Sequence, residues 1–360
     1  MSTAPLTILA PGITRAKRIP YLDTLRSLSI IAVVLLHAAA WDWYRMPVTG
    51  SDWQVLNAYD SLARFCVPVF FMVSGALFLQ PARNITIRSV FRKYLPRILT
   101  AFVVWSAFYA VLGTYGPGGD GSLHTLATQF VLGHYHLWFL FALAGLYLVT
   151  PLLRPLVVDG KIAWYFVVLA VIFASLMPFL TQLPFVGHLL AQILDTMRLN
   201  MVLGYSLFFV LGYLLSTMRL TRKRVRLIAL LGVAGVIATF GLTSLLSLWR
   251  GEPSARFYDF LAPNVIASAV AVFVLVRAFS THSSIEGTPP HPLIALVGKL
   301  SFGIYLVHPF FQWLYQQLGV TADFAPTIIS VPVLTLLILV PSGAVAWFLQ
   351  RIPKVGSYIS

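Results

Sequence analysis

Three ionisable residues, Asp23, Arg26 and His37, interrupt residues 21 to 40, a stretch that is otherwise apolar enough to span a lipid bilayer. On an α-helix, the eleven positions from Arg26 to His37 bring the side chain back to within about 20° of its starting direction, about 16 Å further along the axis. Asp23 lies one turn before Arg26, so all three side chains share one face. Because ionisable groups inside a membrane usually mark a path or a site, this face is a candidate reaction site.

His37 is suited to proton transfer, because an imidazole titrates near neutral pH. It could take the proton of a hydroxyl group that attacks a carbonyl carbon. Alternatively, its own ring nitrogen could attack that carbon and carry the group that is transferred. The sequence does not separate these two roles. We predict that Arg26 and Asp23 belong to the same catalytic site; the structural alternative is a buried Asp–Arg pair that fixes helix packing.

A basic cluster, Arg92, Lys93 and Arg97, stands at one end of the third apolar run. Together with Arg26, these cations are predicted to bind phosphate groups, although the cluster could instead only anchor the helix at the membrane surface. Arg64 lies inside the second run, four residues after Asp60, at the spacing of an intrahelical ion pair. Beyond that pair, Arg64 could contact a substrate or a developing oxyanion.

Two further groups are predicted to contact substrate. His136 and Trp138 lie at the start of the fourth apolar run, where a tryptophan could also be an interfacial belt residue. Ser301, Tyr305 and His308 share one helix face in the ninth run. That polar face should point away from lipid, so it either lines a cavity or holds helices together.

Membrane helices must position all these residues. Apolar runs near 20 residues long predict an all-α, polytopic integral membrane protein with about ten transmembrane helices. Lys and Arg concentrate in alternate connections, which places both termini in the cytoplasm. The predicted spans are 21–40, 58–80, 94–112, 135–153, 162–180, 201–217, 226–248, 260–279, 295–318 and 327–350.

The composition supports this fold class. The chain is 59% hydrophobic and 10% charged, against about 25% charged in soluble domains. Its net charge of +14 comes from short clusters beside apolar runs, which are topology signals and not a nucleic-acid surface. We predict a cytoplasmic tail over 1–20, a single transmembrane domain over 21–350 and a cytoplasmic tail over 351–360. No metal is predicted, since there is one cysteine and no histidine pair has the His-x3-His spacing of a helical zinc site.

These motifs resemble the membrane acyltransferase-3 family, and are similar to its compact branch, which includes the enterobacterial common antigen O-acetyltransferase. The most specific of them is the Arg26-x10-His37 spacing that follows Leu22-Asp23 in the first span. The other stretches that resemble the family are Val67-Pro68-Val-Phe70-Phe71-Met-Val-Ser74-Gly75, Arg92-Lys93-x3-Arg97, His136-Leu-Trp138-Phe-Leu and Ser301-Phe-Gly303-Ile-Tyr305-Leu-Val-His308-Pro309.

The resemblance implies an O-acyltransferase of the bacterial inner membrane that uses no metal. The donor it implies is cytoplasmic acyl-CoA, commonly acetyl-CoA, and the acceptor is a hydroxyl of a periplasm-facing glycan or lipid-linked sugar. The alternative function is a secondary transporter of a sugar, lipid or organic anion, in which Asp23, Arg26 and His37 would relay protons. The oligomeric state stays open.

Overall fold

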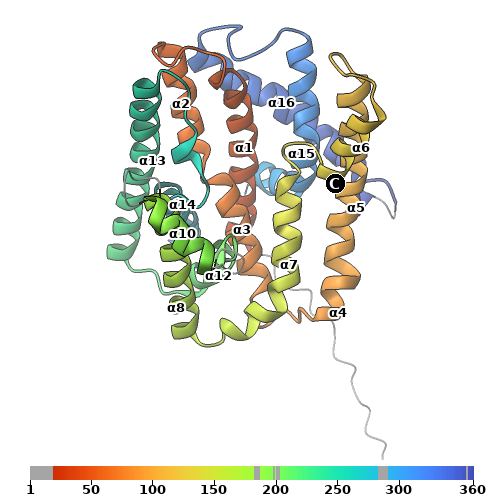
Figure 1. Cartoon of the computed structure of the whole chain (residues 1–360). Coiled ribbons are helices and arrows are strands. Elements are labelled where there is room, and N and C mark those ends of the chain that lie inside the picture. Colours follow the sequence, from red (N-terminus) through yellow and green to blue (C-terminus); the bar gives the residue numbers. More distant parts are fainter. Residues whose placement is uncertain (1–18, 182–186, 198, 200–202, 283–290, 354–355) are drawn as a thin grey trace, which may run out of the picture.

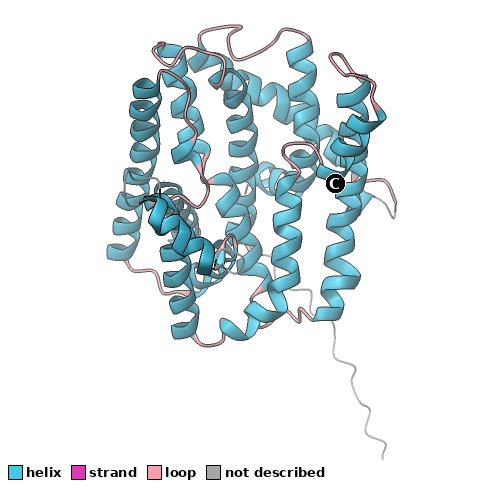
Figure 2. Cartoon of the chain, viewed as in Figure 1, coloured by secondary structure: helices cyan, strands magenta, loops and turns pink. Residues whose placement is uncertain are grey.

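The computed structural model describes residues 19–181, 187–197, 199, 203–282, 291–353 and 356–360. Within these ranges the chain is helical or loop, and no strand is present (Figure 2). Nine segments of the described chain are long and apolar enough to cross a membrane. These findings confirm the predicted all-α, polytopic membrane fold. Nearly all of the predicted tail over 1–20 lies outside the described residues.

The helices surround the first one, α1 (Figure 1). Short irregular turns interrupt some of them: π-helical turns at Val90–Tyr94 and Ile172–Leu176, and a 3-10 turn at Arg256–Tyr258. In chain order the α-helices are α1 Pro20–Trp43, α2 Ser51–Ala63, α3 Cys66–Phe78, α4 Ile87–Ser89, α5 Leu95–Tyr115, α6 Leu123–Leu132, α7 Trp138–Leu156, α8 Gly160–Val171, α9 Met177–Leu180, α10 Gly187–Met197, α12 Ser206–Thr217, α13 Arg222–Arg250, α14 Pro263–His282, α15 Pro292–Gln317, α16 Thr327–Leu349 and α17 Gly356–Ile359.

α1 is the central helix of the bundle. It packs against α2, α3, α14, α15 and α16, and Figure 1 shows it between α2 and α13 on one side and α15 and α5 on the other. Leu25, Ile30 and Val34 are fully buried in these contacts. Small buried residues such as Ala38 and Ala39 let neighbouring helices approach closely. The polar face of α1 therefore lies inside the protein and not against lipid.

The second predicted span is divided into α2 and α3 at residues 64 and 65. Pro68 explains the break, because a proline lacks the N–H that would bond to the Arg64 carbonyl in a continuous helix. The helix restarts with the bond from the Val69 N–H to the Phe65 carbonyl, at 3.0 Å. Arg64 consequently sits at a helix end within the membrane-spanning segment.

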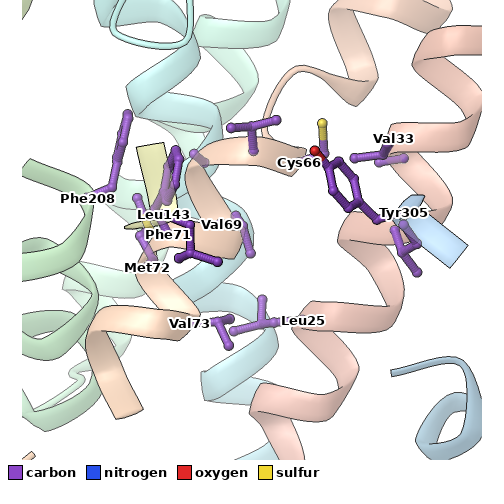
Figure 3. Packing of buried hydrophobic residues seen from close by; sticks show 14 of the residues in the cluster. Leu25, Val33, Cys66, Val69, Phe71, Met72, Val73, Leu143, Phe208 and Tyr305 are labelled. Atoms are coloured by element: carbon purple, nitrogen blue, oxygen red, sulfur yellow. The ribbon is translucent and has the colours of Figure 1, made fainter. Parts of the chain in front are cut away.

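The sixth predicted span, 201–217, corresponds to α12, which has 12 residues and is shorter than a span. Residues 200–202 lie outside the described residues. α12 packs on α3 so closely that a Cβ on Gly75 would lie 1.9 Å from the Phe209 carbonyl oxygen, and one on Gly212 would lie 2.1 Å from that of Met72. Figure 3 shows Phe71 and Met72 of α3 close to Phe208 of α12. Because neighbouring helices cover α12, it is a core helix, and its length is not set by the thickness of the bilayer.

The last described residues pack against α5, near the C-terminus marked in Figure 1. The indole N–H of Trp105 donates to the Ile359 carbonyl at 3.0 Å. Arg97 donates to the Ser360 carbonyl at 3.3 Å, and Ser360 is buried. This segment forms part of the wall around α5, and its predicted cytoplasmic location stays a prediction.

Candidate active site

One large cavity, of about 1800 Å³, runs along α1. Its lining begins with Asp23 and Arg26 at the N-terminal end of α1, continues past His37 and reaches Trp41 and Tyr44 at the C-terminal end. The distance from Asp23 to Trp41 along the helix axis is about 27 Å. This length is close to the thickness of a bilayer's hydrocarbon core, about 30 Å. The cavity therefore follows the membrane-spanning helix from one end to the other.

α15 forms the facing wall and runs parallel to α1. Ser27 donates to the Ile294 carbonyl at 2.6 Å near the start of both helices, and Gln312 donates to the His37 carbonyl at 2.8 Å further along. The helices pack tightly at Gly298, where a Cβ would lie 2.6 Å from the Asp23 carbonyl oxygen. This register sets Ser301 and Tyr305 against the cavity and brings His308 beside His37.

Four imidazoles gather in the middle of this arrangement. The ring of His37 lies 5.1 Å from that of His308, and the His308 ring lies 5.7 Å from that of His136. His134 is hydrogen bonded to His136, with 2.9 Å between their Nδ1 atoms. Within the described part of the chain, neither ring nitrogen of His37 has a hydrogen-bond partner. His37 is thus free to exchange a proton with a molecule in the cavity.

Pro309 determines which ring nitrogen of His308 carries the hydrogen. Pro309 has no N–H for the carbonyl of Tyr305, the residue four positions earlier in α15. The Nδ1 of His308 lies 2.8 Å from that carbonyl oxygen and donates its hydrogen to it. The Nε2 of neutral His308 is then an unprotonated acceptor, and it is buried without a partner among the described residues. Its ring faces His37.

His134 and His136 precede α7 and are held neutral. Burial lowers the pKa of His134 to about 4. Burial, and after it the nearby imidazoles of His308, His134 and His37, lower the pKa of His136 well below its usual range. Tyr305 donates to the His136 carbonyl at 2.6 Å, which fixes this connection against α15.

These lowered pKa values predict a loss of stability in acid. A histidine has a pKa of about 6.5 in an unfolded chain, so between pH 6.5 and about 4 the unfolded state binds more protons at His134 than the native state. The free energy of unfolding should therefore fall as the pH drops from about 6.5 to about 4. Thermal unfolding in nanodiscs should show a smaller decrease for His134→Gln than for the wild type. An exposed histidine on α6, His124, supplies the control His124→Gln, and equal decreases in all three proteins would contradict the prediction.

Arg64 borders the cavity from the break between α2 and α3. Its Nη2 lies 2.7 Å from the Oδ2 of Asp60, which confirms the predicted ion pair. The guanidinium also lies over the ring of Tyr258, 4.1 Å from its centre, and 5.8 Å from that of Phe260. Its Nε–H is buried without a partner in the described chain. Arg64 is thus an anchored cation with one donor to spare.

The opposite end of the cavity is basic. Arg26 pairs with Asp23 at 3.5 Å, as the spacing predicts. Arg83, Arg97 and Lys299 line the same end. Cations held around one opening form a site suited to phosphate groups. We call these residues, together with Arg26, the basic end.

Comparison with protein families matches residues 19–350 to an acyltransferase domain, that of acyltransferase family 3. The chain belongs to this family. Neither the curated proteins nor the solved structures gave a match. The protein is therefore a multi-pass membrane acyltransferase, and the cavity along α1 is the candidate active site of this acyltransferase.

The structure brings most of the predicted site residues to this one cavity. The predicted residues in its lining are Asp23, Arg26, His37, Arg64, Arg97, His136, Trp138, Ser301 and Tyr305. His308 lies directly behind, with its ring against His37. Arg92 and Lys93 are exposed outside the lining. Their role in donor binding stays a prediction, as do the roles of the other site residues.

Sequence reasoning did not select several charged and imidazole side chains of the cavity, among them Arg83, Lys299 and His134. Arg83 and Lys299 join the basic end, and His134 joins the imidazole cluster. In the sequence, Arg83 and Lys299 are basic residues next to apolar runs. Their position beside apolar runs is also the pattern of simple anchoring, so the sequence carried no signal that separates the two roles.

Proposed function

We propose that this acyltransferase moves an acetyl group from acetyl-CoA to a hydroxyl of a glycan or lipid-linked sugar. The observation that carries the proposal is the single cavity, which joins the basic end to His37. Acetyl-CoA binds with its phosphates at the basic end, and its thioester reaches along the cavity toward His37. The acceptor enters from the other end.

In the reaction we propose, the hydroxyl oxygen attacks the thioester carbonyl carbon and the C–S bond breaks. His37 takes the hydroxyl proton and returns it to the departing sulfur, so that free CoA and the ester are the products. Arg64, whose Nε–H has no partner in the described chain, contacts the acceptor or the negative oxygen that develops on the carbonyl. Acyl transfer through an acetylated His37 is the second route that these residues allow.

We further propose that the protein belongs to the compact branch of the family. We also propose that it lies in the bacterial inner membrane with both termini in the cytoplasm, so that its acceptor faces the periplasm. The charge bias of the connections supports this orientation. A secondary transporter would bind its cargo without breaking a thioester. Release of free CoA from acetyl-CoA by the purified protein, measured with a thiol reagent, therefore tests the proposal, and absence of release with every glycan tried would overturn it.

Donor binding should depend on Arg97 much more than on Arg92. Arg97 lines the cavity, whereas Arg92 is exposed outside it on the preceding π-helical turn. A hydrogen bond to a charged group contributes about 1.5–3 kcal/mol, so Arg97→Ala should weaken acetyl-CoA binding by at least about tenfold in calorimetry. Arg92→Ala is the matched comparison and should weaken binding much less, because Arg92 lies outside the cavity lining. Equal weakening by both would mean that general surface charge, and not this cavity, attracts the donor.

A further inference from the structure

We propose that the end of the cavity beyond His37 is a binding site for an uncharged sugar ring, which stacks on Trp41 and is hydrogen bonded by Gln316. This inference rests on the proposed function and specifies its acceptor. The site lies where the C-terminal ends of α1 and α15 meet. We call it the vestibule, and its lining residues are Trp41, Tyr44, Arg45, Trp313, Gln316, Gln317 and Thr321.

The vestibule differs chemically from the basic end of the same cavity. Trp41, Tyr44 and Trp313 offer flat aromatic faces, whereas Gln316 and Thr321 offer neutral donors and acceptors. A pyranose ring presents the matching groups, an apolar C–H face and a rim of hydroxyls that both donate and accept. Aromatic residues at a membrane surface are often only an interfacial belt. Here the three aromatic residues line the cavity, so a ligand inside it meets them.

The charges of the vestibule favour an uncharged ligand. Arg45 lines this end, but it lies 4.0 Å from a carboxylate oxygen of Asp42 and its guanidinium stands over the Trp41 ring at 5.7 Å. His134, further in, is neutral at physiological pH, because burial lowers its pKa to about 4. Among the described residues of the vestibule there is no further cation, and the next one along the cavity, Arg64, is already paired with Asp60 at 2.7 Å. An anionic sugar would lose its hydration there and meet only cations that already have an acidic partner, Asp42 for Arg45 and Asp60 for Arg64, so its charge would gain little in return.

The vestibule also stands at the right distance from His37. Trp41 is one helical turn beyond His37, about 6 Å along the axis of α1. Gln312 lies between the vestibule and His37. Its amide nitrogen donates to the His37 carbonyl at 2.8 Å, and its amide oxygen accepts from the Tyr135 hydroxyl at 3.1 Å. Gln316 is one turn beyond Gln312, and its side-chain amide has no partner within the described chain. A sugar ring on Trp41 can therefore place a hydroxyl at the His37 imidazole while Gln316 binds another.

Saturation-transfer difference NMR tests this site without any need for acyl transfer. The protein is placed in phospholipid nanodiscs, because sugar detergents would compete, and is mixed with methyl glucopyranoside or with methyl glucuronopyranoside. We expect saturation transfer to the ring C–H protons of the glucoside and at least tenfold weaker binding of the glucuronoside. Trp41→Ala should weaken glucoside binding by about tenfold or more, and Gln316→Ala, which leaves the aromatic wall intact, by several-fold.

The control is Trp249→Ala on α13, where the tryptophan is 82% exposed and outside the cavity lining, and it should leave binding unchanged. No glucoside binding, or wild-type binding by both Trp41→Ala and Gln316→Ala, would overturn the site. Equal binding of the two sugars would overturn its preference for uncharged rings. Release of CoA from acetyl-CoA is measured separately, so failure of the vestibule is distinguished from failure of the proposed function.

Discussion

Replacing His37 with alanine is expected to lower acyl transfer by about 10² to 10⁴-fold, the usual contribution of a general base. The His37 imidazole lines the cavity, has no hydrogen-bond partner in the described chain and lies between the basic end and the vestibule. The donor phosphates are expected to bind at the basic end, about 16 Å away along α1 at Arg26. Acetyl-CoA affinity should therefore stay close to that of the wild type, and calorimetry measures it in the same preparation.

The matched control for this variant is His124→Ala, because His124 is exposed on α6 and outside the cavity. It should transfer at the wild-type rate. Transfer at the wild-type rate by folded His37→Ala would remove His37 from the mechanism. Mass spectrometry of the wild type with acetyl-CoA alone separates the two chemical routes: an acetyl carrier gains an acetyl group that His37→Ala lacks, whereas a general base gains none.

Contacts between residues three or four positions apart in the chain were predictable from the sequence, because helix geometry determines them. The i, i+3 pair of Asp23 and Arg26 and the i, i+4 pair of Asp60 and Arg64 are both present. The polar face of α1 turns inward, since lipid would exclude its charges. The break before α3 was not predicted, although Pro68, which removes a helical hydrogen bond, is a signal for it in the sequence. The short α12 was not predictable, since its apolar composition is the same for a core helix and for a lipid-facing one.

Long-range relations depended on how helices pack, which the sequence did not reveal. His37 and His308 are 271 positions apart in the chain, and their contact depends on the parallel register of α1 and α15. That register depends on particular fits, such as the one between Gly298 and the Asp23 carbonyl. The same packing separates the predicted basic cluster, since Arg97 lines the cavity whereas Arg92 and Lys93 lie outside its lining. The vestibule likewise combines the ends of two helices that are distant in the chain.

Transfer should require donor and acceptor on opposite sides of the membrane. The cations that suit CoA line the basic end, and the aromatic and amide side chains line the other, with His37 between them along about 27 Å of cavity. Each charge held inside a bilayer costs about 2.5 to 3.5 kcal/mol or more, so an enzyme that worked from one face would gain nothing from placing Arg26 and Arg64 along this path. An acyl-CoA whose thioester arm reaches inward from one face, and an acceptor hydroxyl that enters from the other face, would together use both Arg26 and Arg64.

The measurement uses proteoliposomes in which a protease site at the N-terminus reports the orientation of the protein. Acetyl-CoA is supplied on the side of the N-terminus, and a glycan acceptor that was active in detergent is supplied on the other side. We expect product in this arrangement and almost none when both substrates are on either single side, whereas opening the vesicles with detergent should restore transfer in every case. Product that forms only with both substrates on one side would show that the acyl group does not travel through the cavity. The His37→Ala variant, tested in the same vesicles, should abolish the transfer across the membrane without making them leak, which ties the passage of the acyl group to the chemistry at that imidazole.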